Sequence, residues 1–200
     1  MNSPNFFNDL LIRTKRIFPR SFGEIRMQAQ DLLKEMCKGE KNKPKSVQML
    51  TVERIFPCIA IYKAITMVTG KSDIAYDLIG EYYEDISLEQ CKSVRNICRM
   101  PILYRLVPGF AARWIRKHFS TKCGFKMKVH KAHGKECHID MLKCPYVNYC
   151  RIYECEELVT AFCSADDVIF RNMHPNVSWD RTRAIGRGDR YCDFIIQIDR

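Results

Sequence analysis

The chain has 200 residues, of which 46% are hydrophobic, and 33 Lys and Arg against 23 Asp and Glu give a formal net charge of +10. This length suits one domain with a substantial core, and no apolar run approaches the ~20 residues of a membrane helix, which excludes a transmembrane segment. Residues 1–5 contain no basic stretch leading into an apolar one, so we expect a cytoplasmic protein whose eleven cysteines are reduced.

The positive charge is concentrated in residues 90–135, which contain no Asp or Glu. Such a stretch attracts anions, namely nucleic acid, an anionic membrane surface or a carboxylate substrate. The sequence has no ribonucleoprotein signature, zinc-finger spacing or clear helix-turn-helix, so no specific nucleic-acid partner is expected. The simplest interpretation is the solvated face of a basic protein.

Apolar residues recur at helical spacing through residues 1–120, which predicts an N-terminal helical region. Ser3-Pro4 is typical of a helix start, and Ser21 and Ser87 each begin a capping-box pattern. The apolar segment 46–69 predicts a buried central helix bent near Pro57. Further helices are expected over 21–39, 72–84, 87–100 and 102–118, the last with a bend at Pro108-Gly109.

The pattern changes to strict alternation after Gly124, which predicts strands. Residues 125–143 are expected to form one hairpin and 177–198 a second, with a helical stretch, 145–173, between them. The predicted class is α+β: an N-terminal helical region followed by a small antiparallel sheet of two hairpins with an intervening helical segment. We divide the chain into 1–120 and 121–200 and expect one compact unit.

Three cysteines and an acidic pair fall at the boundaries of predicted elements. Cys144 precedes a proline that begins a helix, where the helix dipole and free N–H groups stabilise a thiolate. Cys163, Asp166 and Asp167 are spaced to share one helix face, which suits proton transfer or the orientation of a water. Cys192 lies in the last strand with its side chain toward the core. Each thiol alone is most simply a small buried hydrophobe, but the three together suggest a site.

A second cluster, around the first hairpin, consists of possible metal ligands: His130, His133, Cys137, His138 and Cys144. Zinc accepts mixed His and Cys ligands, and a hairpin would bring His130 opposite His138. The spacing matches no standard zinc site. We therefore expect no cofactor, with a divalent metal at His130, His138 and Cys144 as the alternative.

The late motifs resemble those of a known family. Cys144-Pro145-Tyr146, Cys163-x-x-Asp166 and Arg187-Gly188-Asp189-x-x-Cys192-Asp193-Phe194 are similar to motifs of the L-2-amino-thiazoline-4-carboxylic acid hydrolase family. The chain departs from the family pattern, which usually has Thr-Leu-Ala where this sequence has Ala184-Ile185-Gly186. More distantly, the late Cys-x-Phe strand resembles that of 4-vinyl-reductase-like small-molecule-binding domains.

The resemblance implies a hydrolase that opens a small C–N/C–S heterocycle carrying a carboxylate. Such a reaction needs a nucleophile or base, an acid for the leaving sulfur and a cation for the carboxylate. Cys144 or Cys163 is the candidate nucleophile or leaving-group acid, and Asp166 is the candidate base or water-orienting group. The predicted catalytic residues are Cys144, Cys163, Asp166 and Cys192, and the predicted substrate-binding residues are Arg181, Arg183, Gly188 and Asp193. A non-catalytic small-molecule-binding or sensory module is the alternative function, and a homo-oligomer is left open.

Overall fold

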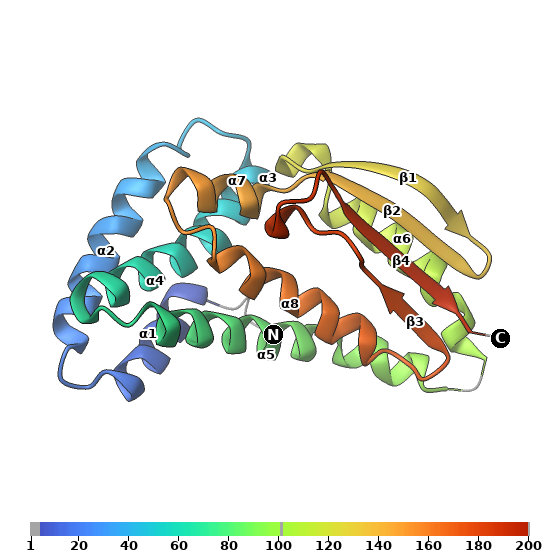
Figure 1. Ribbon diagram of the computed structural model, residues 1–200, viewed down its shortest axis with the longest axis horizontal. Coiled ribbons are helices and arrows are strands. Elements are labelled where there is room, and N and C mark those ends of the chain that lie inside the picture. The colour runs from blue at the N-terminus through green and yellow to red at the C-terminus, as the bar shows by residue number, and fades with distance from the viewer. Residues whose placement is uncertain (1–4, 101, 200) are drawn as a thin grey trace.

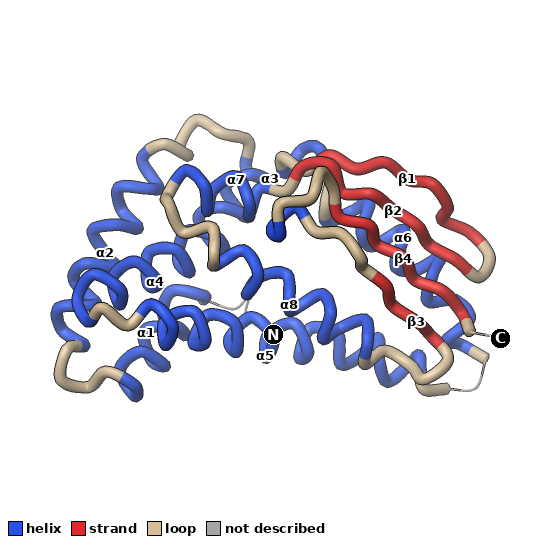
Figure 2. The backbone as a smooth tube through the Cα atoms, viewed as in Figure 1, coloured by secondary structure: helices blue, strands red, loops and turns tan. Residues whose placement is uncertain are grey.

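The computed structural model describes residues 5–100 and 102–199, so the predicted start at Ser3-Pro4 falls outside the described residues. Within them, eight α-helices and a four-stranded antiparallel sheet form the fold (Figure 1). Helices α1 to α4 and α7 gather at one end, the strands lie at the other end with α6 behind them, and α5 and α8 run between the two (Figure 2). This arrangement confirms the predicted α+β class with its helices first.

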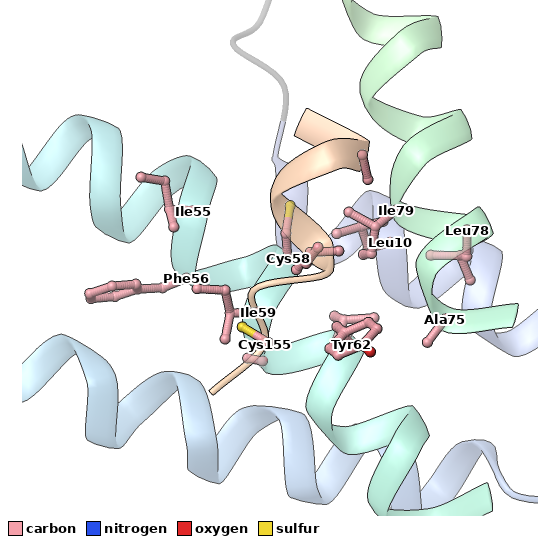
Figure 3. Close-up of a cluster of buried hydrophobic side chains, with 14 of the residues drawn as sticks. Leu10, Ile55, Phe56, Cys58, Ile59, Tyr62, Ala75, Leu78, Ile79 and Cys155 are labelled. Carbon is pink, nitrogen blue, oxygen red and sulfur yellow. The ribbon is translucent and has the colours of Figure 1, made fainter. Parts of the chain in front are cut away.

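Helix α4, Phe56–Thr69, is the centre of the helical body, and nearly all of its first ten residues are buried. A helix that is apolar on all sides must be surrounded by other elements. Helices α1 (Phe6–Ile17), α2 (Phe22–Lys38) and α5 (Ser72–Cys98) pack against it. Figure 3 shows side chains of α1, α4 and α5 meeting in this core, among them Leu10, Ile59 and Ile79.

The apolar segment 46–69 is not one bent α-helix, as its pattern had predicted. Helix α3, Lys45–Leu50, passes through a π-helical turn, Thr51–Ile55, into α4. Pro57 has no N–H to donate to the carbonyl of Glu53, so the regular hydrogen-bond ladder is interrupted just before the proline. The irregularity therefore precedes Pro57.

Two other predicted boundaries are wrong. Ser87 caps no helix, because α5 continues from Ser72 to Cys98 and packs along α8, Leu158–Arg171. Pro108 does not bend a helix but lies in the first turn of α6, Val107–His118. At that position the missing proline N–H would have no partner within the helix in any case.

The sheet has the strand order β1-β2-β4-β3, so the two hairpins join through β2 and β4. Helix α6 packs across the face of the sheet that carries Cys137, Ile139 and Ile196 (Figure 1). The strands are β1 (Lys126–His133), β2 (Glu136–Lys143), β3 (Val177–Asp180) and β4 (Cys192–Ile198).

The predicted helical stretch 145–173 consists of two helices, α7 (Pro145–Ile152) and α8. Helix α8 packs on α5 and on β3, so it connects the helical body to the sheet (Figure 1). All eleven cysteines are free thiols. Among the described residues, no helix combines the length and the apolar character needed to cross a membrane.

Candidate functional site

The chain between β3 and β4, residues 181–191, folds directly onto α8. A Cβ atom added to Gly186 would lie 2.5 Å from Cγ1 of Val159 and 3.8 Å from the sulfur of Cys163. Because only glycine fits at that separation, Gly186 allows this connecting segment to pack against the face of α8 that carries Cys163. Arg181 and Arg183 fall within the predicted hairpin 177–198 but are not part of its first strand, since β3 ends at Asp180.

Arg181 is the central charge of this site, and its side chain is only 6% exposed. Its Nη2 donates to Oδ2 of Asp167 at 2.7 Å and to the carbonyl oxygen of Cys163 at 3.1 Å. Its Nη1 lies 3.9 Å from Oδ2 of Asp166 and has no hydrogen-bond partner among the described residues. A buried guanidinium nitrogen without a partner is energetically costly, so it marks a position where a ligand would be stabilised.

A second hydrogen-bond donor, besides Arg181, holds the carboxylate of Asp167 in place. The indole Nε1 of Trp179 on β3 donates to its Oδ1 at 2.8 Å. The carboxylate therefore joins α8 to the end of β3 and orients Arg181 at the same time. A charge-assisted pair of this kind is stronger than a neutral hydrogen bond.

Asp193 and Asp189 hold the backbone of the connecting segment. Asp193 accepts from the Thr182 hydroxyl and from the Arg183 N–H, both at 2.6 Å. Burial alone would raise the pKa of Asp193, but these hydrogen bonds lower it below its ordinary value. Asp189 accepts from the Ala184 N–H at 2.8 Å. Asp193, which we predicted to bind substrate, thus has its oxygens engaged with the segment that carries Arg181.

A cavity of about 140 Å³ opens between α8 and the connecting segment. Arginine, thiol and hydroxyl groups line it, so it suits a small polar ligand. Its lining residues are Thr160, Cys163, Ser164, Asp167, Arg181, Ala184, Gly186 and Arg187. A second cavity, of about 170 Å³ between α5, α6 and α8, is almost wholly apolar and contains none of the predicted site residues.

The predicted catalytic residues converge, but only Cys163 lines the polar cavity. Burial raises the pKa of the Cys163 thiol to about 12; the charge of Arg181 lowers it, and Asp166, Cys144 and Cys192 raise it. These groups therefore lie close enough to influence one another electrostatically. No hydrogen bond found among the described residues joins any two of the four.

Cys144 does not behave as a helix-stabilised thiolate. It is the N-cap residue of α7, as predicted, and the N–H groups of Val147 and Tyr146 lower its pKa. Burial is the larger effect and raises that pKa to about 12. Burial likewise raises the pKa of Cys192, although its sulfur accepts from the Ile185 N–H at 3.2 Å.

Asp166 is the carboxyl group of the site whose pKa is raised toward neutrality. Burial raises its pKa from 3.8 to about 6; Arg181 opposes that change and Asp167 adds to it. Its side chain is 29% exposed. A carboxyl group that titrates near neutrality is suited to general acid–base catalysis.

The other two predicted binding residues lie away from the cavity. Arg183 is exposed and donates to the hydroxyl of Tyr191. Gly188, also exposed, adopts a φ of 95° and donates its N–H to the carbonyl of Ile185 at 3.1 Å. Its place in the motif follows from this left-handed turn, which favours glycine.

The predicted metal cluster needs one correction. Among the described residues, His130 and His138 are grouped with Asp140, and Cys144 is not part of that group. The side chain of His133 is outside the description. Cys144 lies after the end of β2, whereas Asp140 is two residues from His138 on the same strand and therefore on the same face.

The family model of the L-2-amino-thiazoline-4-carboxylic acid hydrolases matches residues 48–196. The chain belongs to this family. The match contains every residue that lines the cavity, and also Cys144, Asp166 and Cys192. The site therefore lies within the region that the L-2-amino-thiazoline-4-carboxylic acid hydrolases share. No curated protein matches this member of the family in sequence.

Two solved structures are similar over almost the whole chain of this hydrolase-family member. They are crystal structures of the Fe(II) unliganded H-NOX protein from K. algicida and of a mutant of that protein. Each shares 12% sequence identity, covers 98% of this chain and 95% of its own, and has a TM-score of 0.39.

Sequence reasoning missed several residues of the cavity wall. Thr160 and Ser164 lie one turn apart on α8, and Arg187 lies in the motif that carried the resemblance. The spacing of Thr160, Cys163, Ser164 and Asp167, which places them on one helix face, was the signal available in the sequence. Nothing local indicated that Arg187 would turn back toward this face.

Proposed function

We propose that this protein is a hydrolase that opens a small thiazoline-type ring bearing a carboxylate, at the cavity between α8 and residues 181–191. The family assignment supports the reaction class. The observation that carries the choice of site is the buried Nη1 of Arg181, which is without a hydrogen-bond partner among the described residues and belongs to a side chain lining the cavity. A substrate carboxylate would provide that partner.

The size and charge of the cavity support a small anionic ligand. At about 140 Å³ it is below the roughly 300–1,000 Å³ of pockets for drug-sized ligands. Arg181 and Arg187 contribute two positive charges to its wall, against one carboxylate, Asp167, which Arg181 already pairs with. The ligand's own carboxylate would bring the charges of the cavity wall closer to balance.

Asp166 is the proposed base. At neutral pH a carboxyl group with a pKa of about 6 is mostly ionised, so it would accept a proton from a water attacking the ring carbon between nitrogen and sulfur. Because Asp166 does not line the cavity, we place the attacking water between its carboxylate and the ring. Attack breaks the ring C=N π bond, and the proton of the adduct's hydroxyl passes to the ring nitrogen. Collapse of the adduct then forms the carbonyl and cleaves the carbon–sulfur bond, and protonated Asp166 would return its proton to the departing sulfur. The product is an N-carbamoyl amino acid with a free thiol.

Cys163 is proposed to contact the substrate as a neutral thiol. With a pKa of about 12, its thiolate fraction at pH 7 is about 10⁻⁵, and the thiolate is the nucleophilic form. Covalent catalysis by this thiol is therefore disfavoured relative to direct attack by water. A weak S–H donor at the cavity wall remains available to the ring.

The competing function is binding without turnover. It is favoured by one observation, namely that three of the four candidate catalytic residues lie outside the cavity wall. In that case the ligand would raise the melting temperature by mass action, but no ring opening would follow.

The two functions are separated by incubating the purified chain with 2-amino-thiazoline-4-carboxylate. The protein is then removed by filtration and the filtrate tested for free thiol and for the addition of one water by mass spectrometry. We expect turnover with the wild type, its loss in Asp166→Asn and measurable activity in Cys163→Ser. Cys37→Ser, at a half-buried thiol of α2, is the matched control. A thermal shift without any thiol release across related rings would establish the binding module instead.

A further inference from the structure

We propose that His130, His138 and Asp140 bind a divalent cation of the zinc type on the face of the sheet opposite α6. One potential ligand atom from each of the three side chains lies within 4.8 Å of the others. The site is separate from the cavity at α8, so the inference does not depend on the proposed hydrolase activity.

The strand register explains why the three side chains meet. His138 and Asp140 are two residues apart on β2 and share a face, whereas Cys137 and Ile139 point to the core. On β1, Val129 pairs with Ile139 but Lys131 pairs with His138, so the register shifts at residue 130. His130 is the extra residue of this β-bulge, and a bulge re-aims the side chain it carries.

The side chains of His130, His138 and Asp140 already contact one another. Nε2 of His130 lies 2.6 Å from Oδ2 of Asp140, and Nε2 of His138 lies 3.5 Å from Oδ1. The two imidazole rings stack with centroids 4.4 Å apart and planes at 23°. A tetrahedral ion with bonds of about 2.0–2.1 Å holds its ligand atoms about 3.3 Å apart. The two nitrogen–oxygen distances lie on either side of that value, so rotation of these side chains would admit an ion.

An unpartnered buried oxygen independently indicates a ligand. Asp140 is 9% exposed, and its Oδ1 is buried without a hydrogen-bond partner among the described residues. The His138 nitrogen at 3.5 Å is too far for a good hydrogen bond. A buried carboxylate oxygen left in this state is costly, and a cation would satisfy it.

The donor set selects the kind of cation. Two imidazole nitrogens and one carboxylate oxygen suit zinc, cobalt or nickel, while magnesium and calcium prefer oxygen ligands alone. Asp193, opposite Asp140 on β4, is not free to join, because Thr182 and Arg183 occupy its oxygens. A fourth position would remain for water.

Binding would stabilise the edge of the sheet. β1 pairs only with β2 in the order β1-β2-β4-β3, and the ion would tie His130 of β1 to two residues of β2. Any ligand that binds only the folded chain raises its stability by mass action.

The test uses cobalt(II) with the full-length chain, since eleven thiols would also compete for zinc. We expect saturable visible absorption of about one equivalent, without a thiolate-to-cobalt charge-transfer band, because no sulfur belongs to the site. His138→Gln and Asp140→Asn should each weaken binding by about 100-fold or more. His118→Gln, an exposed histidine of α6, is the matched control and should bind as the wild type does.

Three results would overturn the inference: no saturable cobalt spectrum, a spectrum with thiolate charge transfer, or affinity unchanged in the His138 and Asp140 variants. Circular dichroism checks that Asp140→Asn remains folded. If it does not, His130→Gln replaces it, because His130 is exposed and its removal leaves the core intact.

Discussion

The helical body and the sheet end are stabilised by different interactions. Around α4 the body buries mostly apolar side chains, such as Ile59 and Ile65, and the carboxylate of Glu40, which is also buried there, is paired with Lys43. The sheet end has smaller apolar clusters and places a charged network between α8 and β3, in which Arg181 pairs with Asp167. Buried polar atoms are costly when they lack a partner, and Nη1 of Arg181 has none among the described residues. The site is therefore a place where the fold gives up stability for a polar group.

The first prediction concerns catalysis, where the expected effect is largest. Asp166→Asn should lower kcat by a factor of about 10²–10⁴, the usual contribution of a general base. In the wild type, activity should rise with pH through about 6 as Asp166 ionises. The measurement is a pH–rate profile for both proteins; an unchanged profile in the variant would remove Asp166 from the mechanism.

The second prediction tests the helical body. Ile59 is fully buried, so Ile59→Ala should lower the free energy of unfolding by about 2–5 kcal/mol. The activity of the molecules that remain folded should not change, because Ile59 does not line the cavity. Chemical denaturation measures the loss, and Ile152→Ala, at an exposed position of α7, is the control with little expected effect.

The third prediction concerns how the ionisation of Asp166 changes the free energy of unfolding as the pH rises. Its folded pKa of about 6 exceeds the ordinary 3.8, so the folded chain holds a proton that the unfolded chain has released. The stability that this proton provides is fully present below about pH 4 and is lost as the pH rises through 6. A tenfold change in a protonation equilibrium is worth about 1.4 kcal/mol, so the loss is at most about 3 kcal/mol.

Asp166→Asn should therefore be more stable than the wild type at pH 8, even though it is less active. Denaturation at pH 4 and pH 8 measures the difference between the two proteins. A variant less stable than the wild type at pH 8 would mean that the pairing of Asp166 with Arg181 outweighs its burial.

The fourth prediction tests the packing of the connecting segment on α8. Gly186→Ala should destabilise by about 1–3 kcal/mol, because the new Cβ would lie 2.5 Å from a methyl group of Val159. Adding Val159→Ala should recover part of the loss. Gly23→Ala, in α2 with open space around it, should be neutral or slightly stabilising. Equal effects of the two alanines would show that the segment is not tightly packed.

Part of the site was predictable because it follows local rules. Cys163, Asp166 and Asp167 share a face since they lie on one helix, and Cys192 faces inward because strands alternate. The departure from the family pattern at Gly186 has a structural counterpart, as Val159 occupies the space that a Cβ would need. That compensation involves residues far apart in sequence and was invisible without the fold.

The sequence by itself determined the α+β class, the order of helices and strands, and the family, because periodicity and short motifs are local properties. Only the tertiary structure decided which of the grouped residues line a cavity, that burial rather than the helix dipole controls Cys144, and that Asp140 rather than Cys144 completes the histidine pair. The physical reason is that desolvation and cross-strand register depend on residues brought together by folding, and neither is encoded in any short stretch of the chain.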